Sequence, residues 1–187
     1  MAKIKNPKTV KEILINQMDK VYDARINLGL FAVGGIFMLG LGCSVMDMKI
    51  LRIVALAYML LILLIGYLAN RYSAYALFLR VGTAISTFIF TSFVTQWVVR
   101  RFILSSEADF FDEKGVIDRW QVIKGIKETL VPGWIIGAVA AIAIIILGNV
   151  TGNKAGKKDT PELVNKAGGE EAYSQAVTEA FNEYHRH

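Results

Sequence analysis

Four long runs of apolar residues, separated by short polar segments, dominate the pattern along the chain. A run of about 20 apolar residues is long enough for a helix to cross the hydrocarbon core of a bilayer. The pattern therefore predicts an all-α membrane protein with four transmembrane helices, the first three joined by tight turns at 47–49 and 70–72. The four predicted spans are 26–46, 50–69, 73–99 and 133–147.

Amphipathic segments flank these spans, with apolar residues at i, i+3 and i+4 and charged residues on the opposite side. One covers 6–25, where Asn6 is a candidate cap and Pro7 suits the first helical position. It predicts a helix that lies on a membrane surface, on a partner or on the protein itself. A second, at 116–130, is expected to be an interfacial helix, and a third covers 170–184 in the tail.

The segment TGNKAGKKD after the fourth span is typical of a flexible basic linker. Pro132 is expected to start a new helix or to bend the existing one, and the sequence around Pro161 predicts another helix start. The chain thus divides into an amphipathic N-terminal helix (1–25), a three-span bundle (26–101), an extramembrane loop with the interfacial helix (102–130), a fourth span (131–149) and a soluble linker with a helical tail (150–187).

The third span carries a stripe of hydroxyl groups, because its threonines recur at every fourth position and share one face of a helix. Gly82 and Ser86 lie beside the stripe. Small and hydroxyl-bearing faces are typical of contacts between transmembrane helices, where close packing and interhelical hydrogen bonds hold the helices together. The alternative is a stripe that lines a water-filled path. The stripe consists of Thr83, Thr87, Thr91 and Thr95.

Glycines predict two more faces for helix packing, since they let helix backbones approach closely in lipid. The first span contributes Gly34, Gly35 and Gly42. The fourth span contributes the row Gly133, Gly137 and Ala141 at intervals of four. The second span is rich in Leu and Ile, and we expect it to be the most exposed to lipid.

Composition agrees with a membrane protein. Hydrophobic residues make up 54% of the 187 residues, against roughly 45–50% in soluble domains, and mean hydropathy is +0.43. The net charge of +5 is not gathered into a basic face with groove-reading elements, so nucleic-acid binding is not expected and anionic lipids are the expected partners. With four spans, thirteen of the 21 Lys and Arg residues fall on the side of the termini, which predicts both termini in the cytoplasm or the mitochondrial matrix.

Arginine and tryptophan at the ends of apolar segments mark the level of the membrane interface. Arg80 is expected to reach lipid headgroups with its apolar stem along the helix, or alternatively to face a polar cavity, a lipid phosphate or a partner carboxylate. The expected interface residues are Arg80, Trp97, Arg100, Arg101, Trp120 and Trp134. In the tail, an aromatic and apolar stripe predicts docking to a neighbouring subunit through Tyr173, Val177, Phe181 and Tyr184.

Reactive groups are scarce in the predicted spans, which contain no His, Asp or Glu. We therefore expect no catalytic residue, no metal site and no cofactor, although a structural phospholipid is compatible with the interfaces. The pattern favours a non-catalytic accessory subunit of a large membrane complex of the respiratory-chain or ATP-synthase type, in the mitochondrial inner membrane rather than a bacterial one. Alternatives are a component of a bacterial inner-membrane secretion or conjugation machine and a small oligomeric channel or transporter that uses the threonine stripe. An enzyme acting on lipid or quinone is least favoured.

Overall fold

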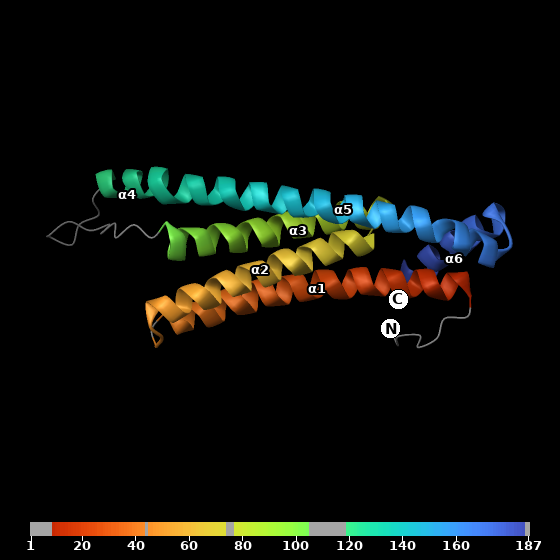
Figure 1. The fold of residues 1–187 in the computed structure, drawn as a ribbon, viewed down its shortest axis with the longest axis horizontal. Coiled ribbons are helices and arrows are strands. Elements are labelled where there is room, and N and C mark those ends of the chain that lie inside the picture. The colour runs from red at the N-terminus through yellow and green to blue at the C-terminus, as the bar shows by residue number, and fades with distance from the viewer. Residues whose placement is uncertain (1–8, 44, 74–76, 105–118, 186–187) are drawn as a thin grey trace.

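The computed structural model describes residues 9–43, 45–73, 77–104 and 119–185, which form long helices with no strand among them (Figure 1). Four helical stretches are long and apolar enough to cross a membrane, namely Val10–Gly42, Met48–Tyr72, Leu79–Ile103 and Val122–Ala167. The prediction of four apolar helices of membrane-crossing length is thereby confirmed. The helices are α1 (Val10–Gly42), α2 (Met48–Tyr72), α3 (Leu77–Val98), α4 (Arg119–Gly125), α5 (Val131–Ala167) and α6 (Glu170–His185), with π-helical turns at Val99–Ile103 and Ile126–Leu130.

Helix α1 joins the predicted N-terminal amphipathic helix and the first span into one rod. It begins with a capping box, in which the Glu12 amide donates to the Thr9 hydroxyl at 3.3 Å and the Thr9 amide donates to the Glu12 carboxylate at 3.2 Å. The boundary expected at residue 25 is therefore absent from the helix, while the predicted cap at Asn6 lies outside the described residues.

Helix α2 begins two residues before the predicted span and ends later. Asp47 caps it, with its carboxylate accepting from the Lys49 amide at 2.8 Å. The turn predicted at 70–72 is wrong, because the helix continues through these residues and closes at Ser73, whose hydroxyl donates to the carbonyl of Asn70 at 2.9 Å. Asn70 therefore projects into the bundle instead of the solvent.

Helices α4 and α5 form a nearly continuous line, so residues 119–130 of the predicted interfacial helix are an extension of the fourth span (Figure 1). Residues 116–118 of that prediction lie outside the described residues. Proline has no amide hydrogen and crowds the carbonyl four residues before it. The wider π-helical turn at Ile126–Leu130 lies immediately before Pro132 and accommodates this without breaking the rod. At the other end, the segment predicted to be a flexible linker is helical through Ala167.

A glycine pair reverses the chain after α5. Gly168 and Gly169 have φ angles of 93° and 132°, in the region that side chains rarely tolerate. Their amides donate to the carbonyls of Asn165 and Val164, which closes the helix end in the manner of a Schellman motif. Helix α6 consequently folds back along the bundle.

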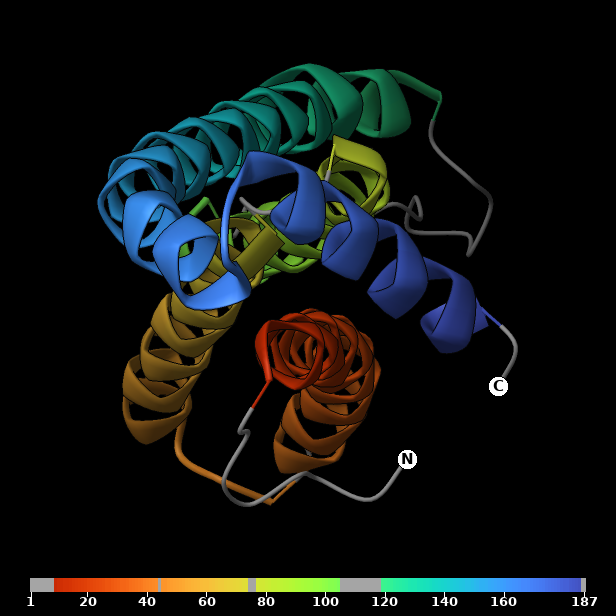
Figure 2. The same ribbon diagram turned by 90° about the vertical axis from the view of Figure 1, so that its right-hand side faces the viewer.

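Helices α2 and α3 lie in the middle of the bundle, and α1 and α5 flank them on opposite sides (Figure 2). In the most apolar stretch of α2, 22% of residues are buried, against 17% in α1 and in α5, so α2 is not the most exposed span as predicted. Large apolar side chains cover the outer faces of all four stretches. This surface supports an integral multi-pass membrane protein.

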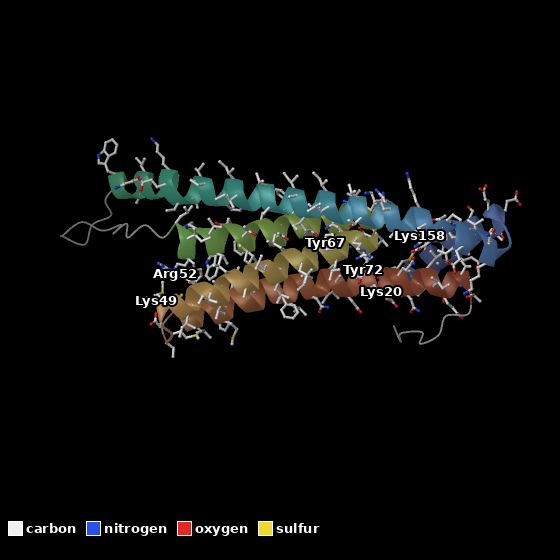
Figure 3. All side chains as sticks on the ribbon, in the orientation of Figure 1. Lys20, Lys49, Arg52, Tyr67, Tyr72 and Lys158 are labelled. Carbon is white, nitrogen blue, oxygen red and sulfur yellow. The ribbon has the colours of Figure 1, made fainter. Side chains whose placement is uncertain are left out.

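The helices form two regions with separate cores. In the bundle, side chains of α1, α2 and α3 share one apolar cluster, with Phe102 at its far end. Beyond the end of α2, α6 packs on the first half of α1 and the last part of α5. We call this second region, made of residues 10–25, 149–167 and 170–185, the head. Lys20 and Lys158 belong to the head, whereas Lys49 and Arg52 lie at the opposite end of the bundle (Figure 3).

Candidate functional site

The threonine stripe lies inside the bundle, where α3 meets α2 and α5. Thr83, Thr87 and Thr91 are fully buried and Thr95 is 2% exposed. The Thr83 hydroxyl donates to the carbonyl of Leu79 at 2.6 Å, as hydroxyls in helices commonly do. The stripe is thus part of a contact between helices within the chain.

Asn70 is the polar residue that sequence reasoning missed. Its side chain is fully buried, and its amide nitrogen donates to the Gly66 carbonyl at 2.9 Å and to the Thr87 hydroxyl at 2.8 Å. The bond to Thr87 ties α2 to α3 inside the bundle. The sequence does contain one indication: Asn70 follows Gly66 by four residues, so the two share one face of a helix. The turn predicted at 70–72 excludes Asn70 from that helix.

Helix α5 approaches both central helices at backbone distance through its glycines. A Cβ atom added at Gly137 would stand 2.5 Å from the backbone oxygen of Ser92 on α3. One added at Gly148 would stand 2.6 Å from the Cβ of Asn70 on α2. One added at Gly133 would lie 3.4 Å from the backbone oxygen of Gln96, and Ala141 is fully buried. The structure therefore brings the predicted row of the fourth span against α3.

The glycines of α1 have different surroundings. At Gly35 an added Cβ would lie 2.1 Å from the ring of Tyr58, whose hydroxyl donates to the carbonyls of Phe31 and Ala32 at 3.0 and 2.7 Å. At Gly42 it would meet Leu51 at 3.0 Å. At Gly34 no atom lies within 4 Å. Two of these glycines therefore contact α2, and the third faces outward.

Gly82 and Ser86 face α1, whereas the threonine stripe faces α2 and α5. An added Cβ at Gly82 would lie 3.4 Å from the Arg25 guanidinium, which also donates to the Ser86 hydroxyl at 3.4 Å. Arg25 is intermediate in exposure and is the last residue of the part of α1 that belongs to the head. The two small residues thus give room to an arginine that sequence reasoning did not single out.

The predicted interface residues divide into two groups. Trp97 is partly buried and stacks edge-on against Phe102, with ring centroids 5.6 Å apart, so it belongs to the core. Arg80 lies at the head end and donates to the side-chain oxygen of Asn153 on α5. The remaining four residues are exposed, and they are Arg100, Arg101, Trp120 and Trp134.

The tail stripe that was predicted to dock a neighbouring subunit packs on α1 of the same chain. Ala180 on α6 is fully buried there, and the Lys11 amine lies 2.6 Å from the Glu183 carboxylate at the edge. Burial raises the pKa of Tyr173 and of Tyr184 above the usual 10.0. The α6 residues in this contact include Tyr173, Ala176, Val177, Ala180, Phe181 and Tyr184.

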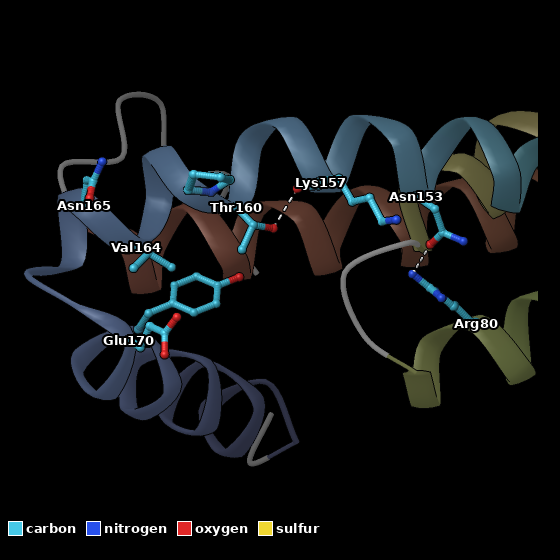
Figure 4. Close-up of a pocket in the computed structure, with 10 residues that line it drawn as sticks. Arg80, Asn153, Lys157, Thr160, Val164, Asn165 and Glu170 are labelled. Atoms are coloured by element: carbon cyan, nitrogen blue, oxygen red, sulfur yellow. Dashed lines mark hydrogen bonds between the residues drawn. The ribbon is translucent and has the colours of Figure 1, made fainter.

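A cavity of about 830 Å³ lies between the first turns of α3, the last part of α5 and the start of α6 (Figure 4). Arg80 and Lys157 line it with Asn153, and Glu170 lies on the α6 side. Apolar surface is supplied by Pro161, Val164 and Tyr173. The cavity therefore combines cationic and apolar walls. In the part of the chain that the structure describes, no group of three or more His, Cys, Asp or Glu side chains is placed to hold a metal ion.

Comparisons with known proteins give no relative from which a role could be transferred: no protein-family model, no curated protein and no solved structure matches this chain.

Proposed function

We propose that this chain is a non-catalytic subunit of a larger membrane assembly, which it joins through the outward face of α1. We call this surface the Gly34 face. It consists of residues that recur at helical spacing and are all exposed, namely Leu30, Gly34, Phe37, Met38 and Leu41.

The observation that carries the proposal is the difference between Gly34 and the glycines that face the interior. Gly35, Gly137 and Gly148 are each in close contact with another helix, whereas a Cβ atom added at Gly34 would meet no atom within 4 Å beyond its chain neighbours and the backbone of its own helix. Hydrocarbon chains are as apolar as leucine, so helices associate in lipid through close packing rather than through expulsion of water. A glycine between large apolar side chains offers such a fit to one further helix.

The packing of the threonine stripe does not favour the alternative function, a channel through this chain. An added Cβ at Gly66 would lie 2.9 Å from Thr87 and 3.1 Å from Thr91, so the hydroxyl stripe meets α2 in close contact. This packing supports a role for the stripe in holding the bundle together.

Native electrophoresis and affinity purification from membranes in a mild detergent test the proposal. We expect the wild-type chain to be part of a discrete heteromeric complex. The Gly34→Leu variant should not join this complex, because the leucine side chain occupies the space that Gly34 leaves open for a neighbouring helix. Ala57→Leu is the matched control, since Ala57 is exposed on a different helix, α2, and is not part of this face. Thermal melting of both variants checks that the fold is retained.

Three outcomes would contradict the proposal. A wild-type chain that purifies alone, or only with copies of itself, has no larger assembly to join. Equal loss of association in both variants would show that the Gly34 face is not special. Retention of Gly34→Leu in the complex would place the contact elsewhere.

A further inference from the structure

The cavity between α3, α5 and α6 lies at the level where the apolar bundle gives way to the polar head. Arg80 is the second residue of the apolar stretch Leu79–Ile103. On α5, Asn153 follows Gly148, which is buried against α2, by little more than one helical turn. Lipid headgroups lie at this depth when the four apolar stretches cross a bilayer.

The walls nearest the bundle are cationic. Figure 4 shows the Lys157 side chain extending along α5 toward Asn153, whose side-chain oxygen accepts from the Arg80 guanidinium. Glu170 lies at the opposite side of the cavity, on α6. A guanidinium and an ammonium group contributed by two different helices are suited to bind a phosphate, the guanidinium through two parallel hydrogen bonds.

Apolar side chains lie inside the cavity and also on α3 next to Arg80 in the sequence. Toward the head, Val164 and Tyr173 line its far wall. Toward the bundle, Val81 and Ile85 follow Arg80 on the outer face of α3, and each is 56% exposed. A phosphate bound at Arg80 can therefore carry hydrocarbon chains down the outside of α3. A small soluble phosphate would contact only the cationic side chains Arg80 and Lys157.

We propose that this cavity binds a phosphate group, and specifically that of an anionic phospholipid in the leaflet on the side of the head. Arg80 and Lys157 hold the phosphate, and Asn153 orients the guanidinium. The lipid then links α3, α5 and α6 at the junction between bundle and head. This binding site does not depend on the assembly proposed for the Gly34 face.

Native mass spectrometry of the full chain, purified in mild detergent and stripped of lipid, provides the test. Phosphatidylglycerol is titrated against wild-type protein, Lys157→Gln and Lys158→Gln. The two lysines are adjacent and both exposed, but only Lys157 lines the cavity. We expect Lys157→Gln to weaken binding about tenfold, as for the loss of one charge-assisted hydrogen bond, and Lys158→Gln to leave it nearly unchanged. Arg80→Lys should also weaken binding, because it keeps the charge but loses the planar fork.

Two further ligands separate the sources of the phosphate. Diacylglycerol has the chains without the phosphate and should bind far more weakly than phosphatidylglycerol. Inorganic phosphate should compete only weakly. Binding of diacylglycerol as tightly as phosphatidylglycerol, or equal losses in Lys157→Gln and Lys158→Gln, would overturn the site. Tight binding of inorganic phosphate without binding of phosphatidylglycerol would overturn the assignment to a lipid. A melting curve of Arg80→Lys confirms that its bundle is intact.

Discussion

The closest approach of α5 to α3 makes a sharp prediction about Gly137. Replacing Gly137 by alanine adds a methyl group 2.5 Å from the backbone oxygen of Ser92 and 3.2 Å from the Cβ of Gln96. The obstructing atom belongs to the backbone, so no change of side-chain rotamer relieves the clash. Gly34→Ala is the matched control, because it makes the same chemical change in an apolar helix with no atom within 4 Å.

The magnitude follows from the geometry. Real Cβ contacts below 3.0 Å are essentially never seen, so α3 and α5 must separate by at least about half an ångström. Forcing an extra carbon into a packed interface costs about 1–3 kcal/mol. Alanine is favoured over glycine in a helix by about 1 kcal/mol, and this gain is common to both variants and cancels between them. Gly137→Ala should therefore be less stable than Gly34→Ala by about 1–3 kcal/mol.

Thermal melting in a mild detergent, followed by size-exclusion chromatography, measures this difference. For chains of this length, 1 kcal/mol corresponds to a shift of about 2–4 °C in Tm, so Gly137→Ala should melt about 2–12 °C below Gly34→Ala. Gly34→Ala itself should melt at or slightly above the wild type. Equal Tm values for the two variants would refute the close contact between α5 and α3, and with it the role given to the glycine row.

Three further predictions concern other contacts. Tyr58→Phe removes both hydrogen bonds that its hydroxyl makes to α1, and should cost about 0.6–1.7 kcal/mol in the same melting assay, whereas an unchanged Tm would mean that these bonds contribute nothing. Ala180→Glu places a charge at a fully buried position in the contact between α6 and α1, so it should loosen α6 and speed proteolysis near Gly168. Gln175→Glu adds the same charge on the exposed side of α6 and should leave the rate unchanged. Equal rates for the two variants would argue against the docking of α6 on α1. Burial raises the pKa of Tyr184 above 10.0, so the stability contributed by its neutral form is present below pH 10.0 and is lost as pH rises through the raised pKa. Cleavage near Gly168 should therefore accelerate above about pH 10, and a rate that stays flat while Tyr184 ionises would contradict this.

Several features could be predicted from the sequence because they depend on local composition. Apolar runs of membrane-crossing length identify four candidate spans without any knowledge of their neighbours. The four-residue spacing of the threonines places them on one face of a helix, and the Gly133–Gly137–Ala141 row follows from the same periodicity. The apolar stripe of α6 was equally visible in the pattern around Val177. These are properties of a single helix, so a single segment of sequence contains them.

What each face contacts was decided only by the tertiary structure. The stripe around Val177 was assigned to another subunit, yet the Gly168–Gly169 reversal brings it onto α1 of the same chain. Asn70 was assigned to a turn, yet its hydrogen bond to Thr87 holds it inside a continuous helix. Local periodicity shows that a face is apolar or small, but its neighbour depends on where distant helices cross. The cavity at Arg80 has the same origin, because its walls come from three helices that only the fold brings together.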